Sequence, residues 1–220
     1  MITSNRIVKL DIARTFAILC VVLCHCSEMT YTQQSVKVAE LGISSRIFMF
    51  GTFTIGRLGV PIFLYLSGIL LLKKTIDGDE DIFKFYKNNL FPLFVVNEIW
   101  VILYKLYGVF VLNEKFIFGD LIRELLLLKN STMVNMWYMP MIIGLYIGIP
   151  LLAKIVKSFS FKVICPIMLA IFIFEYIEPM LNVFVRIFNF KETFYSDMNI
   201  PYMGAAYGLY LLIGYYIYNN

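Results

Sequence analysis

The stretch KLDIARTFAILCVVLCHCSE, residues 9–28, decides the structural class of this chain. It supplies the roughly 20 mostly apolar residues that an α-helix needs to cross the hydrocarbon core of a membrane. It does not read as a cleaved signal peptide, because it contains Asp11 and Arg14 and no small-residue cleavage site follows it. We therefore expect residues 9–28 to form a membrane-spanning helix.

The composition of the whole chain agrees with that expectation. Of 220 residues, 60% are hydrophobic and only 15% are charged, whereas a soluble domain carries about 25% charged residues. The net charge of +4 is small and scattered along the sequence, so it indicates no polyanionic partner. The composition excludes a soluble enzyme, a disordered tail and a nucleic-acid-binding domain.

Further stretches of similar character follow the first one. They are residues 48–72, 88–111, 136–153, 162–181 and 200–218. Lysine and arginine residues near the span ends favour a cytoplasmic N-terminus. The predicted fold class is an all-α, polytopic transmembrane helix bundle of about six spans, which forms a single transmembrane domain over residues 1–220. Residues 119–129 are expected to form a short amphipathic helix on the outer surface.

Ionisable residues within the first span are candidates for function, because charges inside a bilayer are costly. Arg14 and His25, the single histidine, are eleven residues apart. That is close to three helical turns, so both side chains share one face, about 16 Å apart along the helix axis. Asp11 lies one turn before Arg14 and is expected to pair with it.

Two more charges fall within later spans. Arg57 is expected at the same depth as His25, and Glu98 near the middle of the third span, where it would meet Arg57 or Arg14. Three alternatives remain open at this point. In the first, Arg14 only reaches the inner headgroups and has no other role. In the second, Glu98 and Arg57 form a purely structural pair. In the third, Glu28 is an ordinary surface residue.

The cysteines indicate neither a metal site nor a disulfide framework. Cys24, His25 and Cys26 are consecutive, but helical residues two apart point in nearly opposite directions. Small thiols packed in a helix explain them, and we expect no metal.

Three motifs in order resemble membrane-bound acyltransferase family 3, the O-acyltransferases that modify bacterial surface glycans. LDIAR at 10–14, followed by His25, is similar to the family's Arg-x10-His helix. RLGVPIFLYLSG at 57–68 resembles its second motif. WYMP at 137–140 with GLYIGIP at 144–150 resembles its Trp-Tyr segment.

The resemblance implies a multi-pass enzyme of the bacterial cytoplasmic membrane. Such an enzyme moves an acyl group, most simply acetyl, from cytoplasmic acyl-CoA to a hydroxyl of an extracytoplasmic acceptor such as a cell-surface glycan. Its partners would be the lipid bilayer, acyl-CoA and that acceptor. Because the family generally has about ten spans, the resemblance also implies a short or truncated member that lacks the later helices.

Under this reading the residues take different roles. Arg14, with Asp11, would hold the CoA phosphates. His25 would be the general base, or, less directly, would itself be acylated. Arg57 would stabilise the oxyanion, and Glu28 would orient the imidazole. The rival interpretations are a transporter of a small polar solute such as an amino acid, of the kind attached to serine racemases, and an inactive homologue.

Overall fold

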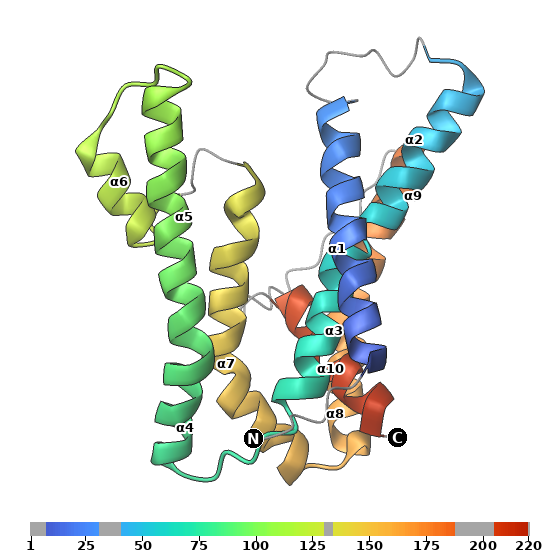
Figure 1. Ribbon diagram of the computed structural model, residues 1–220. Helices are drawn as coiled ribbons and strands as arrows, with labels where there is room; N and C mark the ends of the chain where they lie inside the picture. Colours follow the sequence, from blue (N-terminus) through green and yellow to red (C-terminus); the bar gives the residue numbers. More distant parts are fainter. Residues whose placement is uncertain (1–7, 31–40, 130–133, 188–204, 220) are drawn as a thin grey trace. The chain divides into compact units, whose positions relative to one another are not determined.

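The computed structural model describes residues 8–30, 41–129, 134–187 and 205–219 (Figure 1). All regular structure in these residues is helical, and they contain no strand. The α-helices are α1 Val8–Glu28, α2 Ile43–Gly56, α3 Gly59–Leu71, α4 Asp79–Phe85, α5 Phe91–Phe110, α6 Phe118–Leu125, α7 Tyr138–Ser158, α8 Phe161–Phe172, α9 Glu178–Ile187 and α10 Ala205–Asn219. Short turns of other helical types join some of them, namely Tyr86–Leu90, Val134–Trp137 and Ile173–Ile177.

Five helical stretches of the described residues are long and apolar enough to cross a membrane. They are Val8–Glu28, Ile43–Leu71, Asp79–Phe110, Tyr138–Ser158 and Phe161–Val183. The all-α polytopic class is therefore confirmed, and each of the first five predicted spans has its helix. The predicted span 200–218 falls partly outside the described residues. Its described part is α10, of 15 residues, so the sixth span stays a prediction.

Several helix boundaries differ from the sequence-based expectation. The second span begins at Ile43 instead of residue 48, and the third begins at Asp79 instead of residue 88. Three acidic residues fill the first turn of α4, where negative charge stabilises the N-terminus of a helix. The amphipathic segment predicted at 119–129 forms a helix over Phe118–Leu125.

Prolines account for the places where long helices change their hydrogen bonding. A proline has no N–H to give to the carbonyl four residues earlier. Pro61 follows the break between α2 and α3, at Arg57 and Leu58. Pro92 follows the π-helical turn Tyr86–Leu90, where the amide of Phe91 bonds to the carbonyl of Tyr86. In both places the interruption includes the residue four positions before the proline. The carbonyl of that residue receives no hydrogen bond from the proline, which has no N–H.

The chain divides into two compact units. The first comprises residues 1–73 and 209–220, and the second comprises residues 74–208. Each unit is described by itself below. The single transmembrane domain expected over residues 1–220 stays a prediction.

In the first unit, two glycines let α1 lie directly against α2 and α3. A Cβ atom on Gly56 would stand 2.6 Å from the backbone nitrogen of Cys24, and one on Gly59 would stand 2.8 Å from the carbonyl oxygen of Ala17. Ala17 is fully buried at this contact. Such distances leave no room for a side chain, so the approach of the helices requires glycine at both positions.

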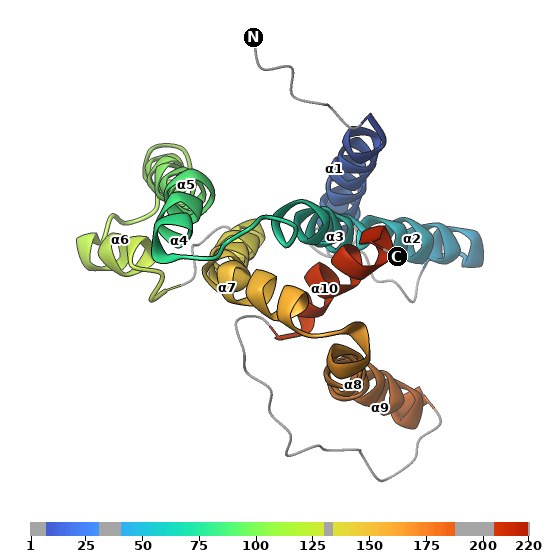
Figure 2. The same cartoon turned by 90° about the horizontal axis from the view of Figure 1, so that it is seen from below.

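The same unit repeats this arrangement between α3 and α10. Hypothetical Cβ atoms on Gly68 and Gly214 would collide with the backbones of Leu211 and Tyr65 respectively. The rings of Tyr65 and Tyr210 meet edge to face at 5.3 Å between centroids. Seen from below, α3 lies between α1 and α10 (Figure 2). Gly68 thus serves helix packing, as expected for small residues inside membranes.

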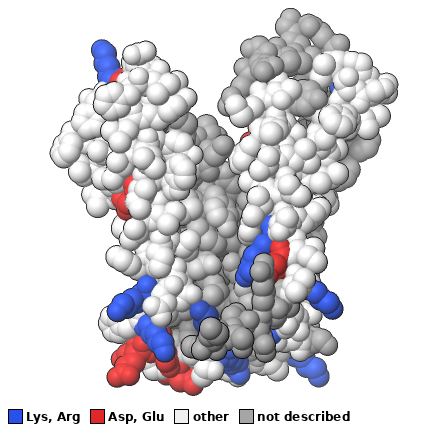
Figure 3. All heavy atoms as spheres, viewed as in Figure 1, with Lys and Arg blue, Asp and Glu red and all other residues white. Residues whose placement is uncertain are grey.

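In the second unit, polar contacts join α5 and its preceding turn to neighbouring helices. The Tyr86 hydroxyl donates to the carbonyl of Ile147 on α7, at 2.9 Å. Lys105 of α5 forms an ion pair with Glu124 of α6, at 2.9 Å between Nζ and Oε1. Most charged side chains visible on this unit gather toward the α4 end of its helices, and uncharged side chains cover most of the rest (Figure 3).

The glycine contact between α1 and α2 can be tested with a matched pair of variants. Gly56→Ala places a methyl group against the Cys24 backbone, whereas Gly51→Ala, also on α2, has nothing within 4 Å. Gly51 lies inside α2 and Gly56 is its last residue, so the gain in helix propensity also favours Gly51→Ala. We expect Gly56→Ala to be less stable than Gly51→Ala by about 1–3 kcal/mol, the usual cost of overpacking. Thermal unfolding in detergent measures this difference, and equal melting temperatures would contradict it.

Candidate functional site

The candidate site runs along one face of α1. Eleven steps of about 100° bring His25 to within about 20° of the direction of Arg14. The structure forms α1 without interruption from Val8 to Glu28, so the predicted shared face exists. The two residues lie about 16 Å apart along the axis, at 1.5 Å per residue.

Arg14 is paired as expected. Its Nη1 atom donates to Oδ1 of Asp11 at 2.8 Å, and the two side chains remain 44% and 26% exposed. This pairing fixes the direction of the guanidinium but leaves part of its donor set accessible. The group therefore remains available to a second anion.

His25 contacts the carboxylate one turn further on. Its Nδ1 atom lies 3.3 Å from Oε2 of Glu28, and the side chains are 32% and 37% exposed. When Nδ1 carries the proton, it donates to the carboxylate and leaves the Nε2 lone pair as the base. Glu28 therefore contacts the imidazole, and its role in orienting the ring stays a prediction.

Arg57 occupies the junction between α2 and α3. It follows Gly56, whose backbone packs on Cys24, the neighbour of His25. This agrees with the expectation that Arg57 and His25 share a depth. The guanidinium carbon lies 4.8 Å from the centroid of the Phe53 ring. Among the described residues, no carboxylate lies within 4.0 Å of it.

A side-chain hydrogen bond joins the C-terminal half of α2 to the outer half of α1. The Ser27 hydroxyl donates to that of Thr52 at 3.2 Å, and Ser27 is buried. This bond lies beyond the glycine contact, on the side of Glu28.

Glu98 lies in the second unit, on α5. Its Oε1 atom accepts a hydrogen bond from Nδ2 of Asn97 at 3.0 Å, and Asn97 is almost fully buried. The expected pairing of Glu98 with Arg57 or Arg14 stays a prediction.

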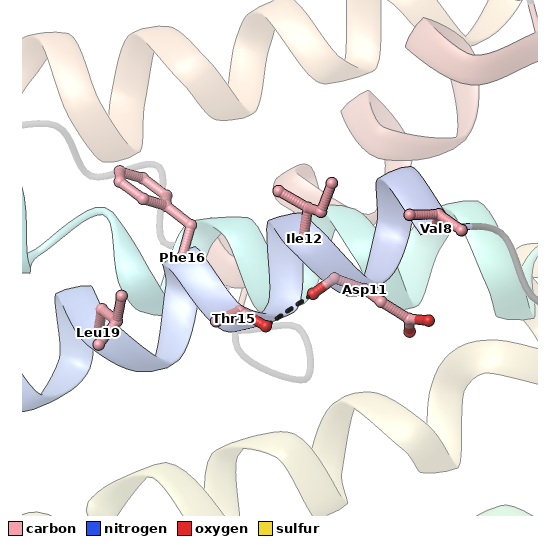
Figure 4. A pocket seen from close by; sticks show the side chains of 6 residues that line it. All are labelled: Val8, Asp11, Ile12, Thr15, Phe16 and Leu19. Carbon is pink, nitrogen blue, oxygen red and sulfur yellow. Dashed lines mark hydrogen bonds between the residues drawn. The ribbon is translucent and has the colours of Figure 1, made fainter.

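An open hollow of about 550 Å³ follows another face of α1 (Figure 4). It is lined by Val8, Asp11, Ile12, Thr15, Phe16 and Leu19. The Thr15 hydroxyl donates to the carbonyl of Asp11 at 3.0 Å, which satisfies that hydroxyl within the helix. Asp11 therefore lies on α1 between the face that carries Arg14 and His25 and the mostly apolar face that lines this hollow.

The described residues contain no group of three or more histidine, cysteine, aspartate or glutamate side chains that could hold a metal ion. Cys24 is buried, whereas Cys26 is exposed. The two thiols therefore lie on different sides of α1.

Sequence reasoning missed one buried charged pair. Lys105 and Glu124 are 9% and 2% exposed, so they are the most enclosed ion pair among the described residues. Lys105 lies inside the predicted span 88–111, where its charge was a visible signal. Its partner lies in a different segment, and nothing in the sequence pairs the two.

The comparison with known proteins now bears on this geometry. A family model described as an acyltransferase domain matches residues 7–220. The chain belongs to the acyltransferase 3 family. No curated protein and no solved structure matches it significantly. The protein is therefore a membrane acyltransferase.

The position of the Arg57 guanidinium can be tested through the ring beneath it. Phe53→Leu removes a cation–π contact worth about 0.5–1 kcal/mol at an exposed site. If Arg57 acts in the reaction, acyl transfer should fall about two- to five-fold. Phe50→Leu, also on α2, is the control, because no cation lies over its ring among the described residues. Equal activities of the two variants would show that the position of the Arg57 guanidinium does not matter for acyl transfer.

Proposed function

We propose that this acyltransferase moves an acyl group, most simply acetyl, from cytoplasmic acyl-CoA to a hydroxyl of an extracytoplasmic acceptor. The proposed acceptor is a cell-surface glycan, and the proposed location is the bacterial cytoplasmic membrane. One observation carries the proposal: a histidine oriented by a carboxylate shares a helix face with an arginine about 16 Å away. The family membership supplies the reaction class.

Arg14 is suited to bind the acyl-CoA donor. A guanidinium binds phosphate oxygens through charge-assisted hydrogen bonds, often two at a time. Its contact with Asp11 holds the side chain in place before the donor binds. The phosphates of CoA would then share the guanidinium with Asp11 or displace that carboxylate.

His25 and Glu28 are suited to activate the acceptor hydroxyl. Nε2 would take the proton of the acceptor hydroxyl as its oxygen attacks the thioester carbonyl. The carbonyl C–O π electrons move to oxygen, and then return as the C–S bond breaks. The CoA thiolate leaves and receives the proton from His25, so the base is restored. Glu28 stabilises the imidazolium that exists between these two steps.

Arg57 is suited to stabilise the negative charge that develops on the carbonyl oxygen. Among the described residues no carboxylate lies within 4.0 Å of its guanidinium, and the ring of Phe53 lies 4.8 Å from the guanidinium carbon. A cation held near the reacting carbonyl stabilises the oxyanion most where water is excluded. The contact of Gly56 with the backbone of Cys24 supports this role, because Arg57 follows Gly56 and His25 follows Cys24.

Two readouts test the donor and acceptor ends separately. Purified protein is titrated with CoA, and stabilisation against heat is followed. We expect Arg14→Ala to lose most of the CoA-induced shift, because it removes the phosphate ligand. Arg46→Ala, an arginine at the start of α2, should keep the shift. His25→Ala should also keep it.

The second readout is transfer of labelled acetyl groups to the cell-surface polymer. His25→Ala should lower transfer by about 10²–10⁴-fold, the usual contribution of a general base. Glu28→Gln should lower it less, because the imidazole remains. If His25→Ala protein expressed at normal level still acylated the polymer, the proposed role of His25 would be wrong. If Arg14→Ala left the CoA-induced thermal stabilisation unchanged, the proposed CoA-binding role of Arg14 on α1 would be wrong.

A further inference from the structure

Helix α6 of the second unit leaves large apolar side chains exposed and buries one of its charged side chains. Its apolar edge consists of Phe118, Leu121, Ile122 and Leu125, and its polar edge of Asp120, Arg123 and Glu124. On the apolar edge, Phe118 is 65% exposed and Ile122 is 40% exposed. On the polar edge, Glu124 is 2% exposed, whereas the Arg123 side chain is 66% exposed. A surface helix in water buries its apolar side, so it would not leave Phe118 and Ile122 exposed.

A buried ion pair produces this orientation. Oε1 of Glu124 accepts from Nζ of Lys105 at 2.9 Å, and both side chains are at least nine-tenths enclosed. In a medium of low polarity each charge is costly without the other. The pair therefore holds the end of α6 against α5, about 8 Å before the C-terminal end of that helix.

The turn that follows α6 is equally well defined. Leu127 adopts a left-handed conformation with φ of 56°, and the amide of Leu128 bonds to the carbonyl of Arg123 at 2.8 Å. This closing pattern normally uses glycine. The returning chain brings Nζ of Lys129 to 2.7 Å from Asp120, and this hydrogen bond lowers the pKa of the Asp120 carboxyl below its ordinary value.

The bare apolar edge continues beyond α6 in both directions. Phe116 and Ile117 before the helix are each 54% exposed, and Leu126 after it is 61% exposed. The end of α5 adds Phe110, which is 77% exposed and belongs to a helix long enough to span the membrane. The edge is thus continuous with a surface that faces lipid. Figure 1 shows α6 folded back beside the upper part of α5.

We propose that α6 is embedded in the membrane interface at the C-terminal end of α5, with its apolar edge among the lipid acyl chains. The Lys105–Glu124 ion pair holds the end of α6 against α5, while Arg123 on the polar edge stays 66% exposed and faces away from the chains. The partner of this surface is therefore the bilayer itself, at the boundary between headgroups and chains. The proposal concerns lipid contact and does not depend on the acyl-transfer mechanism.

Single tryptophans test the orientation in the full-length protein, reconstituted in phosphatidylcholine vesicles. Trp100 and Trp137, the two tryptophans of the chain, are replaced by phenylalanine. One new tryptophan is then placed at Phe118 on the apolar edge or at Arg123 on the polar edge. The probe is phosphatidylcholine brominated near the headgroup end of its chains. We expect Phe118→Trp to be quenched several-fold more strongly by this lipid than Arg123→Trp.

Acrylamide in the aqueous phase gives the complementary measurement. It should quench Arg123→Trp more strongly than Phe118→Trp. If brominated lipid left Phe118→Trp unquenched, the proposal would be wrong. In that case protection from acrylamide would indicate that protein covers the edge, and accessibility to acrylamide that it faces water.

The ion pair is tested by a pair of single variants and their combination. Lys105→Met alone and Glu124→Met alone should each lower the melting temperature, since each leaves one buried charge without a partner. The double variant should recover most of that loss, because it removes both charges together. In the tryptophan background, Lys105→Met should also reduce quenching of Phe118→Trp by brominated lipid. Additive losses in the double variant would overturn the role of the pair.

Discussion

The first unit depends on how closely α1 can approach the junction of α2 and α3. Gly56 and Gly59 flank Arg57 and Leu58, and each allows backbone contact with α1. Without a hydrophobic driving force between helices in lipid, such close packing is what holds them together. The contact also places a cation beside the helix that carries His25. Packing and chemistry therefore rest on the same four residues.

The sequence predicted the class of fold and the local pairs of α1, because both depend only on spacing. A run of apolar residues needs no partner to be recognised as a span, and Asp11–Arg14 and His25–Glu28 are each one helical turn apart. The depth of Arg57 followed from counting residues along its span. These inferences used distances along one helix, which the sequence contains.

Contacts between helices lay beyond that reasoning. The Lys105–Glu124 pair joins residues 19 apart in sequence across a turn of the chain, and only the folded structure shows that α6 returns to α5. The same limit applies to Glu98, whose expected partner lies on a different helix. Helix starts also differed, because the acidic residues before α5 form the first turn of a helix, α4.

The π-helical turn at Tyr86–Leu90 has a consequence for the phase of the whole third span. Phe85 and Asn97 are both buried, yet twelve residues separate them. On an uninterrupted helix they would point about 120° apart. The π turn takes up one extra residue, which reduces the mismatch to about 20°. A helical wheel drawn through this span without that correction would therefore place one end of its buried stripe on the wrong side.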